Sequence, residues 1–418
     1  MVDIKKESKQ ISKQIISLRK HFHKYPEIGL EEFETSKRIK QELENIGIEY
    51  KEAAGTGVVA VIGKGEGRTI ALRSDMDAIR IFECTGVSYE SQNHGIMHAC
   101  GHDAHMASLL GAAMILKKYE DQLPGKVVLI FQPSEENCKG AKLMIEEGQL
   151  ADLDIDEIFG LHIFGDIEVG KISIESGPRM AASDIFRIRI KGKAGHAGKP
   201  HQCVDATVVA AATVMNLQTI ISRDIDPIDS AVVTVGHVIS GTQHNIISGE
   251  AYIEGTVRTF SVSTSKLIKE VITRMVYSTA ACYGATVTIE YDLSAHPVVN
   301  NDVEATETAL EGAEKIFSSE NLVHIPKMML GEDFSVYQKR IPGVFVFVGA
   351  GNEEIDRAYQ NHHEKFNIDE KAVIISTELF VAYALEAIKK ESRRHNWLRF
   401  LENNTKIKRE FYFKGELH

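Results

Sequence analysis

The stretch IMHACGHDAHMASLLGAA, residues 96 to 113, places three histidines, a cysteine and an aspartate within eight positions, ahead of an apolar helical pattern. Only Gly101 separates Cys100 from His102, and glycine permits backbone angles that let both side chains face one ion. A thiolate and an imidazole suit zinc or a similar first-row metal. Two other interpretations stay open here: a buried structural cysteine with Asp103 capping the helix, and a nucleophilic cysteine.

Two adjacent carboxylates, Glu135 and Glu136, come shortly after the apolar run KVVLIF at 126–131, which has the length of a buried strand. At such a strand end the pair is unfavourable unless a cation compensates its charge or one carboxyl is protonated. One glutamate can bind a metal while its neighbour acts as a base on a water. A solvated pair in a loop is the competing interpretation.

Histidines occupy two further candidate places. His162 lies in the last stretch of EIFGLHI at 157–163, and His362 and His363 lie in YQNHHEKFNIDE. A lone core histidine is commoner than a ligand, but four such places in one α/β sheet favour a metal site. A nucleophilic Cys100 has less support, because it would leave the two glutamates without a role. The sequence contains neither a G-x-S-x-G elbow nor a G-x-x-x-x-G-K-[ST] phosphate loop.

The elements that must position these residues alternate between buried strands and helices. That alternation predicts an α/β sheet with its ligand site at the carboxyl ends of the strands. Near Ser183 the pattern changes to DIFRIRIKGKAGHAG, whose alternation of apolar and basic residues is typical of a sheet with one wet face. The following elements are predicted in the order β-α-β-β-α-β, the ferredoxin-like arrangement. We therefore divide the chain into a catalytic domain, an inserted domain, a second part of the catalytic domain and a C-terminal extension, at 1–182, 183–298, 299–390 and 391–418.

Composition narrows the class of protein. A chain of 418 residues with 43% hydrophobic and 26% charged residues predicts a globular protein of at least two domains. The net charge of -11 and the lack of a long basic stripe argue against a nucleic-acid partner. No run of 18 apolar residues predicts a membrane span, and five scattered cysteines suit reduced thiols in a cytoplasm. The basic tail after Lys389 is a docking element or, as we prefer, a solvated extension.

The chain resembles the M20 metallopeptidases, in particular the amidohydrolase branch that includes hippurate hydrolases, N-acyl-amino-acid deacylases and auxin-conjugate hydrolases. The resemblance runs from about His21 to about Glu386 and rests on motifs in order: HFHKYPEIGLEE, RSDMDAI, MHACGHDAHMASLLGAA, FQPSEE, GLHIF, SGPRMAASD, KGKAGHAGKPH, EGTVRTF, GEDFS and HHEKFNIDE. It implies a zinc-exopeptidase-like α/β catalytic domain with an inserted ferredoxin-like dimerisation domain, and hence a homodimer or higher oligomer.

The resemblance also implies roles for residues. The ligands of two divalent ions (Mn²⁺, Zn²⁺, Co²⁺ or Ni²⁺) would be Cys100, His102, Glu136, His162 and His362. His362 is preferred to His363 because the family's ligand stands four residues before the phenylalanine, here Phe366. Glu135 would be the general base and Asp77 an acid beside the metals. The wider family often has histidine at Asp75 and aspartate at Cys100, and both changes are usual in the amidohydrolase branch.

The inserted domain carries three more implied residues. His196 matches the histidine that reaches into the partner subunit's active site to support the oxyanion, while Asn245 and Arg258 match positions that hold the substrate's carboxylate or carbonyl groups. The family usually has N-V-I-P-D where this chain has Asn245-Ile246-Ile247-Ser248-Gly249. Without the proline, we expect a less rigid loop.

The implied reaction is hydrolysis of the amide bond of N-acyl amino acids, with Glu135 deprotonating a water activated by the metals. The products would be a carboxylic acid and a free amino acid. A dipeptidase or carboxypeptidase of the same family is the alternative enzyme. A binding module without turnover would be expected to have lost Glu135 or a ligand, and neither is lost. The sequences of the pocket-lining stretches 179–183 and 327–337 do not indicate which acyl group or which amino-acid side chain the substrate carries.

Overall fold

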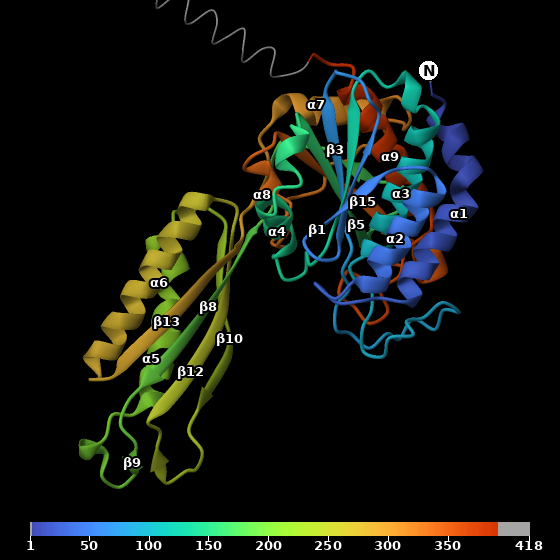
Figure 1. Ribbon diagram of the computed structural model, residues 1–418. Coiled ribbons are helices and arrows are strands. Elements are labelled where there is room, and N and C mark those ends of the chain that lie inside the picture. The colour runs from blue at the N-terminus through green and yellow to red at the C-terminus, as the bar shows by residue number, and fades with distance from the viewer. Residues whose placement is uncertain (1, 392–418) are drawn as a thin grey trace, which may run out of the picture.

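The computed structural model describes residues 2–391, and the basic extension from residue 392 onward lies outside the described residues. Two lobes are visible in Figure 1: a larger one built on a seven-stranded sheet and a smaller, elongated one built on a four-stranded sheet. Within the described range, no helix combines the length and the apolar character that crossing a membrane requires. The mixed α/β class predicted from the sequence is confirmed.

The large sheet has the strand order β1-β2-β4-β3-β5-β15-β6. Its four central strands, β4, β3, β5 and β15, pair in parallel, while β1, β2 and β6 join the edges in antiparallel fashion. Helices cover both faces, so the central strands are apolar on both sides, as expected for parallel sheets. The strands span Tyr50–Ala53 (β1), Gly57–Ile62 (β2), Thr69–Asp75 (β3), Lys126–Gln132 (β4), Glu157–Glu168 (β5), Ile172–Ser173 (β6) and Gly343–Gly351 (β15).

Helices α3 and α9 pack side by side on one face of the sheet, and α1 packs against both of them (Figure 1). The sequence of α3 is apolar nearly all round, and only Met114, Lys117 and Lys118 are not buried. The other face of the sheet carries α4 and α8 over a second apolar core. The helices of this lobe span Ile4–Lys24 (α1), Phe33–Asn45 (α2), His102–Lys118 (α3), Gly140–Glu146 (α4), Val303–Glu314 (α7), Ser335–Gln338 (α8) and Lys371–Ala387 (α9).

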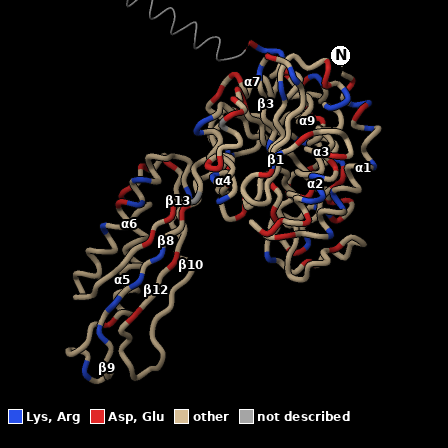
Figure 2. The backbone as a smooth tube through the Cα atoms, viewed as in Figure 1, with Lys and Arg blue, Asp and Glu red and all other residues tan. Residues whose placement is uncertain are grey.

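The small lobe has the predicted β-α-β-β-α-β order, with sheet order β10-β12-β8-β13 and both helices on one face (Figure 1). Its elements span Ala182–Lys191 (β8), Ala206–Leu217 (α5), Ala231–Ser240 (β10), Glu250–Thr259 (β12), Val262–Cys282 (α6) and Thr286–Ala295 (β13). On the open face, Figure 2 shows the basic residues of β8 beside acidic ones of the neighbouring strands, and Arg187 pairs with Glu254 at 2.8 Å. The exact domain boundaries stay predictions.

Two short strand pairs complete the small lobe and its connection. β9 (Gly195–His196) pairs with β11 (Ile246–Ile247) at the far tip of the lobe, and β7 (Gly177–Met180) pairs with β14 (Val298–Asn300) where the two lobes join. The strand pair β7/β14 therefore sets the orientation of the small lobe, because β7 leads almost directly into β8.

Candidate metal centre

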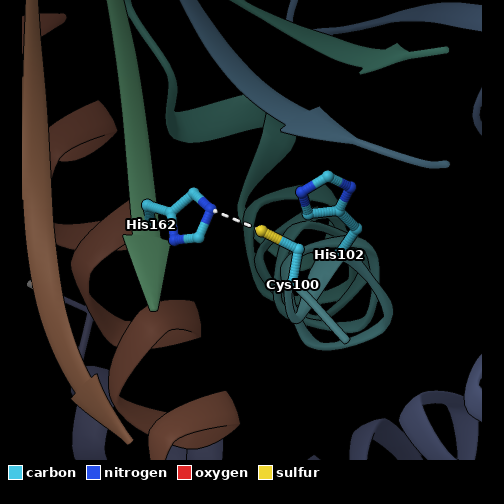
Figure 3. A group of neighbouring side chains, drawn as sticks. All are labelled: Cys100, His102 and His162. Carbon is cyan, nitrogen blue, oxygen red and sulfur yellow. Dashed lines mark hydrogen bonds between the residues drawn. The ribbon is translucent and has the colours of Figure 1, made fainter. Parts of the chain in front are cut away.

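The five predicted metal ligands gather at the carboxyl-terminal end of the large sheet. Cys100 precedes α3 and His102 begins it, Glu136 follows β4, His162 lies in β5 and His362 lies in the loop before α9. Figure 3 shows Cys100 and His162 pointing toward one another with His102 beside them, and the Cys100 Sγ to His162 Nε2 distance is 3.4 Å. Residues more than 260 positions apart in the sequence thus meet at one edge, as predicted.

Gly101 is what lets its two neighbours face the same space. Its φ of 91° lies in the left-handed region, and a Cβ there would come within 2.5 Å of Ile163 Cδ1. A side chain at this position would therefore be strained twice, by its backbone and by Ile163. The C-G-H order of the sequence is thus required by both the turn and the close approach of β5.

Asp77 fixes the glutamate pair. Its two carboxylate oxygens accept hydrogen bonds from the backbone N–H groups of Glu135 and Glu136, each at 3.0 Å. The preceding Ser134 adopts a φ of 57°, and its N–H donates to Glu32 at 2.9 Å. Asp77 acts here through backbone contacts that orient the Glu135 and Glu136 side chains, which agrees with a place beside the metals.

The two buried histidines are held so that one ring nitrogen of each faces the centre. His102 Nδ1 lies 2.8 Å from the Asp77 carbonyl and His162 Nδ1 lies 2.8 Å from the Ile163 carbonyl, so both donate from Nδ1. His102 Nε2 is buried and has no hydrogen-bond partner among the described residues. It lies 4.0 Å from both Glu135 Oε2 and Glu136 Oε1. An unpartnered imidazole lone pair facing two carboxylates fits a cation between them.

The loop that carries His362 is tied to the other ligands. His362 N–H donates to the Ala99 carbonyl at 2.7 Å, and its Nε2 lies 3.3 Å from Glu136 Oε1. The neighbouring Asn361 donates to the carbonyls of Cys100 and Ile163 at 3.0 and 3.1 Å. His362 itself has a φ of 67°, unusual for a residue with a side chain and typical of functional sites. This strained backbone aims the half-exposed imidazole at Glu136.

Among the groups of possible ligands whose ligand atoms lie within 4.8 Å of one another, two share Cys100: Cys100, His102 and His162, and Cys100, Glu136 and His362. Because Cys100 belongs to both, the arrangement fits two neighbouring divalent ions. A mixture of thiolate, imidazole and carboxylate suits Zn²⁺, Mn²⁺, Co²⁺ or Ni²⁺ and does not select among them.

The charges of this centre are unbalanced without cations. Burial, together with Glu332, Glu136 and Asp333, raises the pKa of Glu135 well above its usual value. Burial, Glu136 and Glu135 likewise raise the pKa of the Cys100 thiol. Burial lowers the pKa of His102, but Asp75 and Asp77 outweigh it and raise that pKa to about 10. Divalent ions reverse all three shifts, because they favour thiolate, carboxylate and neutral imidazole.

Arg73 is a residue of the site that the sequence analysis did not single out. It is fully buried in β3 and forms ion pairs with Asp75 at 2.8 Å and with Glu332 and Asp333 at 3.0 Å each. It thereby connects the strand end to the GEDF loop behind Glu135. An arginine inside the apolar strand TIALRSD was the available signal, since a buried arginine needs buried acidic partners.

Four of the five ligands, all except His102, line a cavity of about 770 Å³, which Glu135 also lines. Arg258 reaches this cavity from β12 of the small lobe, and no described carboxylate forms an ion pair with it. Its guanidinium donates only to the carbonyl of Val257 and the hydroxyl of Thr256. Burial lowers the pKa of Arg258 below its usual value, against the opposing effects of Cys138 and Asp184. A guanidinium stays protonated in proteins, so Arg258 is a cation available to an anionic group.

His196 and Asn245 do not lie in this cavity. Both are exposed at the far tip of the small lobe, where β9 pairs with β11 and Ala197 N–H donates to the Asn245 carbonyl at 3.1 Å. The loop that lacks proline is held by backbone bonds instead, including Ala206 N–H to the Ser248 carbonyl at 3.0 Å and Gly192 N–H to the Gly249 carbonyl at 2.8 Å.

Comparison with known proteins gives matches over most of the chain. Peptidase family M20/M25/M40 matches residues 71–386. An N-acetyl-L-cysteine deacetylase of Bacillus subtilis is 42% identical, over 87% of this chain and 86% of the relative. The thermostable carboxypeptidase 2 of Saccharolobus solfataricus is 37% identical, over 92% and 98%. The IAA-amino acid hydrolase ILR1-like 4 of Arabidopsis thaliana is 39% identical, over 88% and 84%.

A solved structure shows the same fold. A dinuclear metal binding peptidase from the M20 family of Bacillus subtilis superposes with a TM-score of 0.78 at 35% identity, over 91% of this chain and 99% of that one. The two-ion arrangement suggested by the shared Cys100 thus has a counterpart in a similar protein.

Proposed function

Because the chain belongs to peptidase family M20/M25/M40, we propose that this metallo-amidohydrolase cleaves the amide bond of N-acyl amino acids to a carboxylic acid and a free amino acid. One observation carries the proposal: the carboxylate pair Glu135 and Glu136, three further metal-ligand side chains (Cys100, His162 and His362) and an arginine without an ion-pair partner among the described residues line a single cavity. The first two suit hydrolysis of an amide, and the arginine suits the carboxylate that every N-acyl amino acid carries.

In the proposed reaction, the residues of this centre have distinct roles. When bound, the divalent ions polarise the scissile carbonyl and lower the pKa of water. Glu136, Cys100 and the three histidines hold those ions, while Glu135 takes a proton from the attacking water on its carboxylate and passes it to the leaving nitrogen. Asp77 keeps Glu135 in place through its backbone N–H. Arg258 binds and orients the substrate carboxylate.

We propose further that the active enzyme is a homodimer, in which His196 of the partner subunit supports the oxyanion. His196 is exposed at the tip farthest from its own cavity, so only a second subunit gives it a substrate to contact. The edge strand β10 exposes Val232, Val238 and Ile239 at 39%, 48% and 55%. An unprotected edge with apolar side chains is a surface for pairing with a second copy. Light scattering on the eluting protein should give twice the chain mass.

A deacetylase and a carboxypeptidase are both represented among the relatives, so the substrate must be tested directly. Metal-stripped enzyme reloaded with one ion at a time should be assayed on N-acetyl and N-benzoyl amino acids and on unblocked dipeptides. We expect the N-acyl amino acids to have the higher kcat/KM. Faster hydrolysis of unblocked dipeptides would favour the dipeptidase or carboxypeptidase alternative.

A further inference from the structure

One side of the cavity is a wall of apolar side chains, Met180, Met328, Met329 and Leu330, which we call the methionine wall. Met180 ends β7, and the other three lie in the loop before the GEDF sequence. Met180 is 2% exposed and Met328 packs on the same apolar core, whereas Leu330 is 47% exposed. The wall is thus an extension of the protein core that reaches the substrate space.

The methionine wall is held in place by backbone hydrogen bonds. Met328 N–H donates to the Arg179 carbonyl at 2.8 Å, and Ala181 N–H lies 3.2 Å from the Met328 carbonyl and 2.8 Å from the Leu330 carbonyl. The loop therefore runs alongside β7, with an isolated parallel bridge between Met180 and Met328. Its backbone is fixed while its methionine side chains can adjust to different apolar shapes.

Arg258 adjoins this wall. In the sheet register Arg258 is opposite Ser183, which follows Met180 by three residues. Gly331, next to Leu330, lies so close to Ser183 that a Cβ on it would be 2.8 Å from Ser183 Cβ. The arginine and the wall therefore belong to one side of the cavity, while the metal ligands form the other.

We infer that the methionine wall binds the side chain of the amino acid half of the substrate, and that this enzyme selects N-acyl amino acids with large apolar side chains. The inference rests on the proposed function. The α-carboxylate and the side chain of an amino acid leave the same carbon atom. When Arg258 holds the carboxylate, the side chain must lie within a few bonds of it, and the methionine wall is the adjoining surface. A negatively charged side chain there would lose its water among apolar neighbours, while Arg258 is already paired with the α-carboxylate.

The test compares kcat/KM for N-acetylglycine, N-acetylleucine, N-acetylmethionine and N-acetylaspartate. Because a missing methylene in an apolar pocket changes kcat/KM by about 10-fold or more, the leucine and methionine substrates should exceed glycine by at least about 10-fold, with aspartate lowest. The double variant Met329→Ala/Leu330→Ala should reduce the leucine-to-glycine ratio of kcat/KM at least about 5-fold, because the loss of apolar contact falls on the larger side chain. Met114→Ala, on α3 away from the cavity, is the control that should leave the ratio unchanged.

Failure of this inference is distinguishable from failure of the proposed function. Two results would contradict a role of the methionine wall in side-chain selection: equal kcat/KM for the glycine, leucine and aspartate substrates, or a leucine-to-glycine ratio that the double variant does not change. Neither result would contradict the proposed amidohydrolase activity. Binding of the same four compounds is measured by calorimetry as well. If none is hydrolysed but N-acetylleucine binds at least about 10-fold more tightly than N-acetylglycine, the proposed activity is wrong and the methionine wall still selects apolar side chains. Equal binding overturns both.

Discussion

At the metal centre the predicted ligands are buried or tied down by backbone hydrogen bonds, whereas at the tip of the small lobe His196 and Asn245 are exposed and contact little of their own subunit. All five predicted metal ligands come together within one chain. The tip has no substrate space of its own. The contrast underlies our proposal that one chain supplies two parts of an active site, which would meet only between subunits.

The largest expected effect tests the centre. Glu135→Gln removes the base but keeps the size of the side chain, so kcat should fall by at least 10² while two ions per chain remain bound. Steady-state kinetics and elemental analysis on the same preparation measure both quantities. Normal turnover in this variant would remove Glu135 from the reaction.

The next effect tests the tip. His196→Ala should lower kcat by about 10² to 10³, the usual loss for one oxyanion donor, without changing the metal content or the oligomeric state. His201→Ala, also exposed near the tip, is the matched control and should retain wild-type kcat.

Combining the two variants tests the link between the regions. When Glu135→Gln and His196→Ala chains are co-expressed in equal amounts, half of the dimers are mixed and each mixed dimer has one intact site. About a quarter of wild-type activity should therefore return. Activity no higher than that of the separate variants would mean that His196 does not act across a dimer.

A smaller effect concerns the turn that shapes the centre. Gly101→Ala should lower the free energy of unfolding by about 1–3 kcal/mol from its backbone strain, and more from the contact with Ile163. Gly148→Ala also places alanine at a positive φ, 83°, but has no atom within 4 Å of the added Cβ. Denaturant unfolding should therefore show a larger loss for Gly101→Ala than for Gly148→Ala. Equal losses of unfolding free energy in the two variants would show that the Ile163 side chain moves aside without cost.

The smallest effect is a pH dependence beside the centre. Burial and Asp77 raise the pKa of Glu32 to about 7, although Thr56 and Ser134 donate to it. Stability from a carboxyl with a raised pKa is present below the unfolded value near 4.5 and is lost as pH rises through about 7. From pH 5 to pH 8, wild type should lose about 2 kcal/mol of unfolding free energy relative to Glu32→Gln. A difference that does not vary with pH would contradict the burial of a titrating Glu32.

How far the sequence predicts these features depends on how local they are. Cys100, Gly101 and His102 are neighbours in the sequence, and Glu135 and Glu136 follow an apolar strand. Short sequence patterns were therefore sufficient to identify these residues. The parallel order of the strands then predicted that the two groups lie close together. The methionine wall and the ion pairs of Arg73 join stretches that are 140 or more residues apart. No local pattern carries such information, because side-chain packing between distant strands decides which residues face the cavity.

The measurement that tests the central claim most directly is the metal content of wild type and of Cys100→Ser. If Cys100 contributes to both ion positions, wild type should bind two divalent ions per chain, and Cys100→Ser should lose them while its circular dichroism spectrum stays that of a folded protein. If Cys100→Ser retains two ions per chain with wild-type affinity, the thiolate is no ligand and the two-ion centre described here is wrong.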